Sequence, residues 1–216
     1  MSKLLKTFFA ILVISLVSYS VKAEMRYGVA AMAGILSTDG TESEDAEGLN
    51  NAAGTTDNNS KSFDEAFYGA SLFAEVVGDN GFALGIDYVP VSFDIGSGSR
   101  TDTTAANDDD SGTRTASAEL EDLITVYTHI PFGGNGLYGI LGIHFAEITT
   151  QETLPASTYG NENIYGGQFG VGYASGNLKY DLFYSDFEDI SLASTSGSSV
   201  VTADADALTL RVSYGF

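Results

Sequence analysis

Two histidines, His129 and His144, are the side chains of this sequence best suited to acid–base chemistry near neutral pH. A lipid-acting hydrolase would need one of them beside a serine nucleophile and held by an orienting acid. Neither histidine begins a local His-x-Ser pattern, because the second residue after each is Pro131 or Ala146. We therefore predict no catalytic site and interpret both histidines as structural residues.

Acidic residues gather in two polar stretches, residues 39–47 and Asp108–Asp110, and hard cations such as Ca²⁺ prefer oxygen ligands of this kind. The spacing matches no EF-hand loop and is typical of hydrated acidic segments. We predict no metal site and no cofactor, although binding of divalent cations by these acidic stretches stays open. Cysteine is absent, which excludes thiolate chemistry and disulfides.

Several charged side chains interrupt segments that otherwise consist of small and apolar residues. Which way these side chains point depends on the secondary structure that carries them. Eight segments have the length and alternation of β-strands. The last runs from Leu208 to Phe216 and alternates strictly, so that Arg211 shares a face with small polar residues. The segments cover approximately residues 25–36, 66–77, 82–93, 118–130, 137–148, 163–174, 177–187 and 208–216.

Two of these segments leave their register open. Phe73 breaks the alternation of residues 66–77. In residues 118–130 we assign one face to Leu120, Ile124, Val126 and Ile130 and the other to Glu121, Thr125 and His129, which leaves Leu123 and Tyr127 on the wrong faces.

The connections alternate in length, which indicates an up-and-down arrangement. Short turns are expected at 78–81, 131–136 and 175–176, and a connection of middle length at 149–162. Longer polar loops are expected at 37–64, 94–115 and 188–204. Transmembrane barrels have short turns at one rim and longer loops at the other, and a tilted strand of about 9–11 residues crosses the bilayer. We predict an all-β fold, an eight-stranded antiparallel up-and-down transmembrane β-barrel.

A soluble lipocalin-like barrel would place the apolar face inside. Here the apolar face carries large aromatic and aliphatic residues, and the opposite face carries small residues that can fill a narrow lumen. We therefore expect the large residues to face lipid, with Tyr27, Tyr88 and Tyr184 near the membrane interfaces.

This assignment turns the interrupting charges toward the lumen, where an isolated ion is expensive and must find a partner. We predict a network of opposite charges that either forms a gated ion path or fixes strand register. The second interpretation is favoured because eight strands enclose space just wide enough for side chains. The predicted lumen polar network consists of Arg26, Glu75, Asp87, Lys179, Asp181 and Arg211.

Residues 1–23 are typical of a secretory signal peptide, with Lys3 and Lys6 before an apolar run and Val21-Lys22-Ala23 before the cleavage point. We expect export by the general secretory route and a barrel domain over residues 24–216. The 29 acidic and 9 basic residues make nucleic acid an implausible partner.

The terminal Tyr214 and Phe216 resemble the assembly signal of bacterial outer-membrane barrels, and residues 25–216 resemble the small barrel family that includes the OmpA barrel and porin-like proteins. This resemblance implies the outer membrane of a Gram-negative bacterium, contact with its lipid and lipopolysaccharide, and insertion by the barrel-assembly machinery. We predict a non-enzymatic protein with a structural or surface-interaction role, with an extracellular partner at the long loops as one option. The alternative is a narrow porin-like channel, and a lipid-modifying barrel enzyme is disfavoured.

Overall fold

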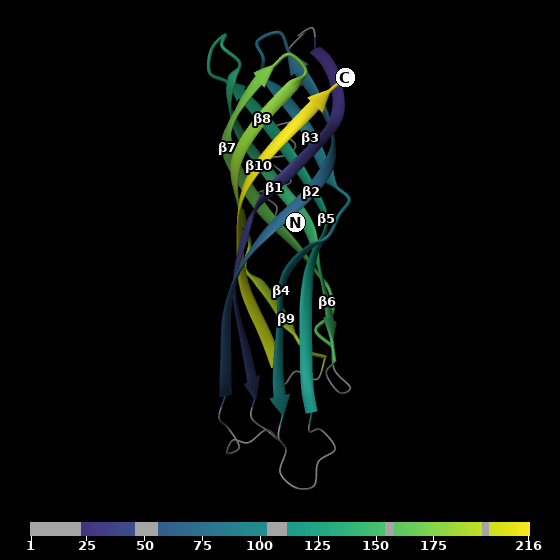
Figure 1. Ribbon diagram of the computed structural model, residues 1–216, viewed down its shortest axis with the longest axis vertical. Coiled ribbons are helices and arrows are strands. Elements are labelled where there is room, and N and C mark those ends of the chain that lie inside the picture. Colours follow the sequence, from purple (N-terminus) through teal and green to yellow (C-terminus); the bar gives the residue numbers. More distant parts are fainter. Residues whose placement is uncertain (1–22, 46–55, 103–111, 154–157, 196–198) are drawn as a thin grey trace, which may run out of the picture.

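The computed structural model describes residues 23–45, 56–102, 112–153, 158–195 and 199–216, and the regular elements in these ranges are β-strands (Figure 1). They contain no helix of the length and hydrophobicity needed to cross a bilayer. The signal-peptide prediction falls almost entirely outside the described residues. The strands are β1 (Ala23–Asp45), β2 (Thr56–Gly78), β3 (Ala83–Val89), β4 (Phe93–Asp102), β5 (Gly112–Pro131), β6 (Leu137–Glu152), β7 (Glu162–Ser175), β8 (Leu178–Phe187), β9 (Ile190–Ala193) and β10 (Ser199–Gly215).

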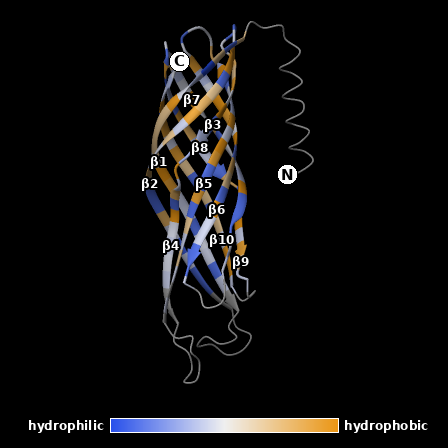
Figure 2. Ribbon diagram, turned by 90° about the vertical axis from the view of Figure 1, so that its right-hand side faces the viewer, coloured by the Kyte–Doolittle hydropathy of each residue, from blue (hydrophilic) through white to orange (hydrophobic). Residues whose placement is uncertain are grey.

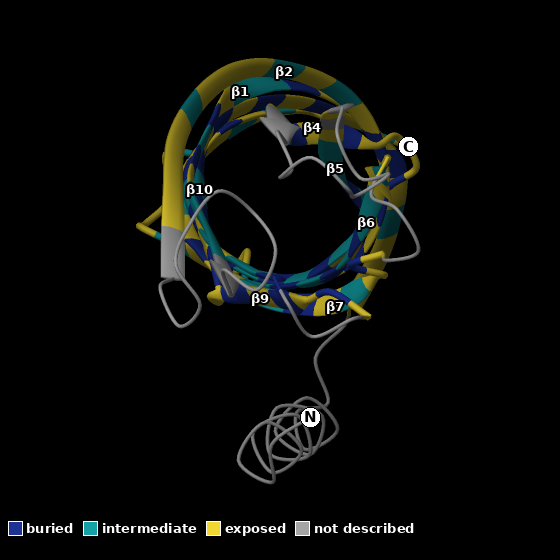
Figure 3. Ribbon diagram, turned by 90° about the horizontal axis from the view of Figure 1, so that it is seen from below, coloured by how far each residue is buried: buried dark blue, intermediate teal, exposed yellow. Residues whose placement is uncertain are grey.

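The strands close into a tall antiparallel barrel. β1 pairs with β10 from Gly28 opposite Gly215 to Glu44 opposite Ser199, which joins the two ends of the sheet. β3 and β4 are successive parts of one wall strand against β5, and β8 and β9 are successive parts of another against β10. The result is a ring of eight strands, visible end-on in Figure 3, which confirms the predicted fold.

An apolar belt covers the outer wall near the end of the barrel that carries the C-terminus. It includes Tyr27, Val29, Tyr68, Leu72, Ile86, Leu141, Phe169, Val171, Leu182, Leu208, Leu210, Tyr214 and Phe216. Figure 2 shows the hydrophobic colours concentrated toward this end, whereas the opposite end is polar. The large residues face outward, so a lipocalin-like interior is excluded and the belt is the surface that lipid covers.

The strands extend far beyond the belt, and here the prediction of loops was wrong. Residues 37–45 and 56–64 pair with each other in β1 and β2, and residues 94–102 and 199–207 belong to β4 and β10. Outside the bilayer a wall strand is held by its ladder of backbone hydrogen bonds and needs no apolar face toward lipid. Such a strand can therefore consist of Ser, Thr, Gly and Asp. The middles of the longest predicted loops lie outside the described residues.

A β-bulge corrects the predicted faces of β5. Pairing with β6 shifts between Glu121 and Ile124, and Asp122 has a positive φ of 50°. The extra residue reverses the alternation, so Leu120 is buried in the lumen while Ile124 belongs to the outer face. Tyr127 therefore faces inward together with Thr125, as a lumen residue.

Phe73 also faces the lumen, where it is buried. Its ring occupies the space beside Gly28, the residue directly opposite it on β1, where any side chain would collide with the ring. The aromatic residue that broke the pattern of β2 thus fills the lumen at a glycine.

Candidate functional site

The half of the lumen nearer the termini is filled by an ionic network centred on Arg211 of β10. The guanidinium donates hydrogen bonds to Asp181 through Nε at 3.0 Å and to Asp87 through Nη1 at 2.6 Å. A further guanidinium nitrogen, Nη2, lies 2.9 Å from Asp181 Oδ2. Only 4% of Arg211 is exposed, so both carboxylates are neutralised by a charge that water hardly reaches.

Glu75 of β2 anchors the second part of the network. The Lys179 ammonium bonds one carboxylate oxygen of Glu75, and the Tyr127 hydroxyl donates to the other at 3.1 Å. Tyr138 donates similarly to Asp181 at 2.5 Å. Buried charges that have both an ion-pair partner and additional hydrogen bonds are the kind that a protein interior tolerates.

Strand register brings these groups together. Arg211 and Asp181 are directly opposite each other on β10 and β8, and Asp181 in turn is opposite Gly172 on β7. A side chain at Gly172 would occupy the space of the Tyr138 ring and the Asp181 carboxylate. Alternating glycines on the lumen face therefore make room for the long polar side chains of neighbouring strands.

The structure gathers Glu75, Asp87, Lys179, Asp181 and Arg211 in one network but does not include Arg26. Arg26 lies opposite Glu75 on β1, yet its guanidinium turns toward the rim and bonds Glu24 at 3.1 Å. At the rim the guanidinium of Arg26 stays partly hydrated. It would lose this water if it turned into the lumen.

Sequence reasoning missed the two tyrosines of the network. The sequence left Tyr127 on the wrong face for an apolar residue and gave Tyr138 no role, because a tyrosine contributes to an apolar pattern and to hydrogen bonding alike. The signal that could have found Tyr127 is its place between Thr125 and His129 on the polar face of β5.

His144 makes the contact that the sequence did not predict. Its Nε2 lies 3.0 Å from Ser185 Oγ and its Nδ1 lies 2.8 Å from Thr125 Oγ1. A serine–histidine pair can activate a nucleophile, but here the third member is an alcohol rather than an acid. The adjoining cavity measures about 40 Å³, and Ser185 and His144 are both buried. A substrate larger than a few water molecules has no room beside this pair.

His129 lies in the ionic network between two rings that are tilted relative to its own. Its ring centroid is 4.7 Å from that of Tyr127 and 4.4 Å from that of Tyr138. Nδ1 lies 3.8 Å from a Glu75 oxygen, while Nε2 has no partner among the described residues. Both histidines are thus buried interior residues of the lumen.

An apolar layer covers the network on the side away from the termini. Phe93 contacts Phe67 with ring centroids 4.9 Å apart, and further buried side chains from most of the wall strands complete the layer. They include Met32, Leu36, Leu120, Ile148, Ile164, Phe187 and Ile190. The charged network and the apolar layer line a common cavity of about 40 Å³, which has room for no more than a few water molecules.

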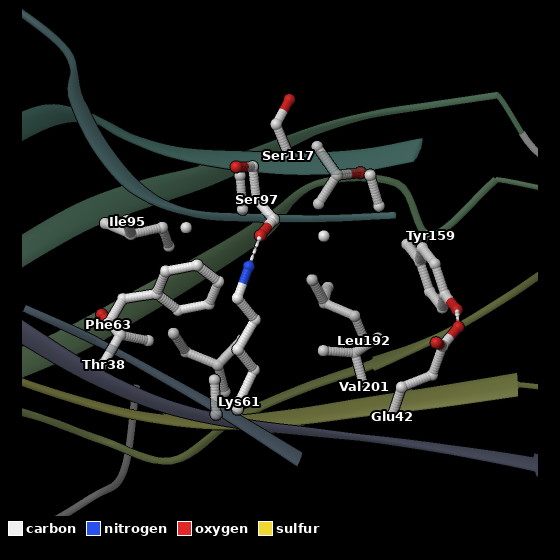
Figure 4. A pocket seen from close by; sticks show the side chains of 18 of the residues that line it. Thr38, Glu42, Lys61, Phe63, Ile95, Ser97, Ser117, Tyr159, Leu192 and Val201 are labelled. Carbon is white, nitrogen blue, oxygen red and sulfur yellow. Dashed lines mark hydrogen bonds between the residues drawn. The ribbon is translucent and has the colours of Figure 1, made fainter. Parts of the chain in front are cut away.

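On the side of this layer away from the C-terminus the barrel encloses a cavity of about 500 Å³, which we call the cup (Figure 4). Phe63, Ile95, Leu192 and Val201 form much of its wall, and Tyr159 stands at its far side. The Tyr159 hydroxyl donates to Glu42 at 2.6 Å. The cup lies within the part of the barrel whose strands the sequence had suggested to be loops.

Lys61 connects two neighbouring wall strands of the cup, β2 and β4, that share no ladder of backbone hydrogen bonds among the described residues. In the described residues β4 pairs with β5 but forms no ladder with the outer part of β2. Lys61 of β2 donates to the Ser97 carbonyl oxygen of β4 at 2.9 Å, and its ammonium lies 4.3 Å from the Phe63 ring centroid. Side-chain contacts therefore replace ladder bonds between these two strands.

No three His, Asp or Glu side chains among the described residues come together in a group that could hold a metal ion. Glu47 and Asp108–Asp110, which belong to the stretches considered for Ca²⁺, lie outside those residues.

No protein-family model matches the chain, and no curated protein sequence matches it. Among solved structures it is similar to Neisserial surface protein A, with TM-score 0.45 and 14% identity over 90% of this chain and 99% of that one. It is also similar to the outer membrane protein OprG from Pseudomonas aeruginosa, with TM-score 0.48 and 12% identity over 88% of this chain and 95% of that one. The outer membrane protease OmpT from Escherichia coli is similar with TM-score 0.43 and 12% identity over 92% of this chain and 98% of that one.

The closed ring of strands and its apolar belt are the features of a single-chain barrel of the Gram-negative outer membrane. The chain therefore has the fold of small outer-membrane β-barrel proteins, as the sequence predicted.

Proposed function

We propose that this protein is a non-enzymatic barrel that is closed to solutes and acts at the cell surface, through the part of the barrel beyond the belt. The observation that carries this proposal is the filled lumen. The Arg211 and Glu75 ion pairs occupy the half near the C-terminus, and the apolar layer that contains Phe93 lies on the side of these pairs away from the C-terminus. An ion crossing the barrel would have to break the charged pairs and then pass a layer without polar partners.

Residues 1–23 act in this proposal as the export signal, and Tyr214 and Phe216 as the signal read by the barrel-assembly machinery. Lipid and lipopolysaccharide surround the belt. An extracellular partner would contact the polar end of the barrel, where β1, β2 and β10 extend beyond the lipid.

Single-channel recording in planar bilayers tests the closed state. We expect the refolded wild-type protein to produce no current steps, and Arg26→Ala, which changes a rim cation outside the network, to be equally silent. A wild-type conductance that changes on Arg211→Ala would instead establish the alternative, a narrow porin-like channel through the network.

A lipid-modifying activity is tested separately by mass spectrometry of lipid A from cells with and without the protein. We expect identical lipid A species, because Ser185 and His144 lie beside a cavity of about 40 Å³ that admits no acyl chain. A protein-dependent loss of an acyl group that disappears in Ser185→Ala would overturn the non-enzymatic role.

A further inference from the structure

The cup has the size of a small-molecule site. Its volume of about 500 Å³ falls within the range of roughly 300–1,000 Å³ that is typical of ligand pockets. The barrel wall surrounds the cup, and the apolar layer closes it on the side of the C-terminus, so a molecule inside would be surrounded on most sides by protein. A cavity of this kind exceeds what imperfect packing leaves in a protein interior.

The wall of the cup is mainly hydrocarbon. Phe63, Ile95, Ile148, Leu192 and Val201 come from different strands and line the same space. Water gains few hydrogen bonds at such a wall, so a ligand that displaces it is favoured in proportion to the apolar surface that it covers. Serine and threonine hydroxyl groups between these residues could orient one polar end of a ligand.

The charged residues of the lining are already engaged. The Lys61 ammonium is bound to the Ser97 carbonyl oxygen and faces the Phe63 ring, and the Glu42 carboxylate accepts a hydrogen bond from Tyr159. An ionic ligand would have to displace one of these contacts. The formal net charge of −20 further disfavours an anion.

We infer that the cup is a binding site for a small uncharged molecule with a mainly hydrocarbon body, such as an aliphatic alcohol or an alkylated ring. This inference deepens the proposed surface role and rests on it. Because the lumen is closed, the cup is a binding site at the cell surface and not a binding site within a transport pathway. The ligand is held by the apolar wall.

The absence of tryptophan from the chain permits a site-specific test. Phe63→Trp places a single reporter in the cup, and Tyr68→Trp places one on the lipid face, where 79% of Tyr68 is exposed. Each variant is reconstituted in lipid nanodiscs and titrated with a medium-chain bromoalkanol, whose bromine quenches tryptophan on contact. We expect saturable quenching of the cup reporter at concentrations that leave the lipid reporter nearly unchanged.

A filling substitution completes the test. Ala203→Phe, in the Phe63→Trp background, puts a ring into the cup and is expected to abolish the saturable quenching. Ala70→Phe, on the exposed outer face of β2, is the matched control and is expected to retain it. Val201→Trp replaces Phe63→Trp as reporter if the latter does not show the heat-modifiable gel migration of a folded barrel.

Quenching of the cup and lipid reporters in parallel would mean simple partition into the bilayer and would overturn the inference, as would saturable quenching that survives Ala203→Phe. Either result, together with silent bilayers, leaves the closed surface protein standing without this ligand. Current steps from the wild-type protein would overturn the closed state itself, whatever the quenching shows.

Discussion

Arg211 couples two carboxylates that come from opposite parts of the chain. Asp87 lies on β3 and Asp181 on β8, and the guanidinium reaches both because β10 closes the ring between them. A planar fork with several N–H donors suits this role better than a lysine ammonium would. Lys179, the other cation of the described lumen network, is already bound to Glu75.

Arg211→Ala is therefore expected to destabilise the folded barrel by about 3–5 kcal/mol, because it leaves two buried carboxylates without their cation. Urea unfolding in lipid vesicles, followed by loss of the heat-modifiable gel band, measures this change. Arg26→Ala is the control, because its partner Glu24 is at the rim and water replaces the lost contact. A loss as small for Arg211 as for Arg26 would mean that the network adds nothing to stability.

At this scale the sequence predicted which charged residues face the lumen, but it could not predict all of their partners. The alternation around Asp181 and Arg211 was sufficient to place them on one face, and the need of a buried ion for a counter-ion implied a network. Arg26 satisfies the same alternation, but it forms its ion pair with Glu24 because it lies close to the rim. The contact of His144 with Ser185 depends on the register of β6, β7 and β8, which no local pattern records.

Among the elements, β5 shows how one extra residue changes which side chains of a strand face the lumen. The bulge at Asp122 turns Leu120 into the apolar layer while Thr125, Tyr127 and His129 enter the polar network. A regular strand would put either Leu120 outside or Tyr127 among lipid. The bulge therefore marks the level at which the lumen changes from apolar to charged.

The backbone of Asp122 allows a test of this role. Its φ of 50° is costly for most residues and worst for β-branched ones, so Asp122→Val is expected to cost about 1–2 kcal/mol of unfolding free energy. Asp122→Gly is the matched control, because it also removes the hydrogen bond from Tyr88 but adopts this φ without strain. Equal urea midpoints for the two variants would show that the bulge backbone is not strained.

Apolar alternation predicted the strand segments within the belt, and these are present. It failed beyond the belt because residues 37–45 and 56–64 have no lipid to face on one side. Their strands depend on cross-strand ladders between β1 and β2, which are non-local and leave little trace in composition. The cup was hidden for the same reason, since Lys61 and Phe63 lie in a segment whose polarity is typical of loops.

The molecule as a whole has a defined direction: short turns and the C-terminus lie at one end, and the long strand extensions and the cup at the other (Figure 1). In transmembrane barrels the short turns face the periplasm. The cup can meet molecules from outside the cell only if this orientation holds, so the proposed surface role depends on it.

Because the chain contains no cysteine, single cysteines can map the orientation without background. Asn59→Cys, on the outer extension of β2 and lining the cup, should react with a membrane-impermeant maleimide on intact cells. Asn80→Cys, in the exposed short turn between β2 and β3, should react only after the outer membrane is permeabilised. Both sites are exposed, so a difference in labelling reports the side of the membrane rather than burial. Labelling of Asn80→Cys but not Asn59→Cys on intact cells would place the cup in the periplasm and remove the basis for a surface receptor.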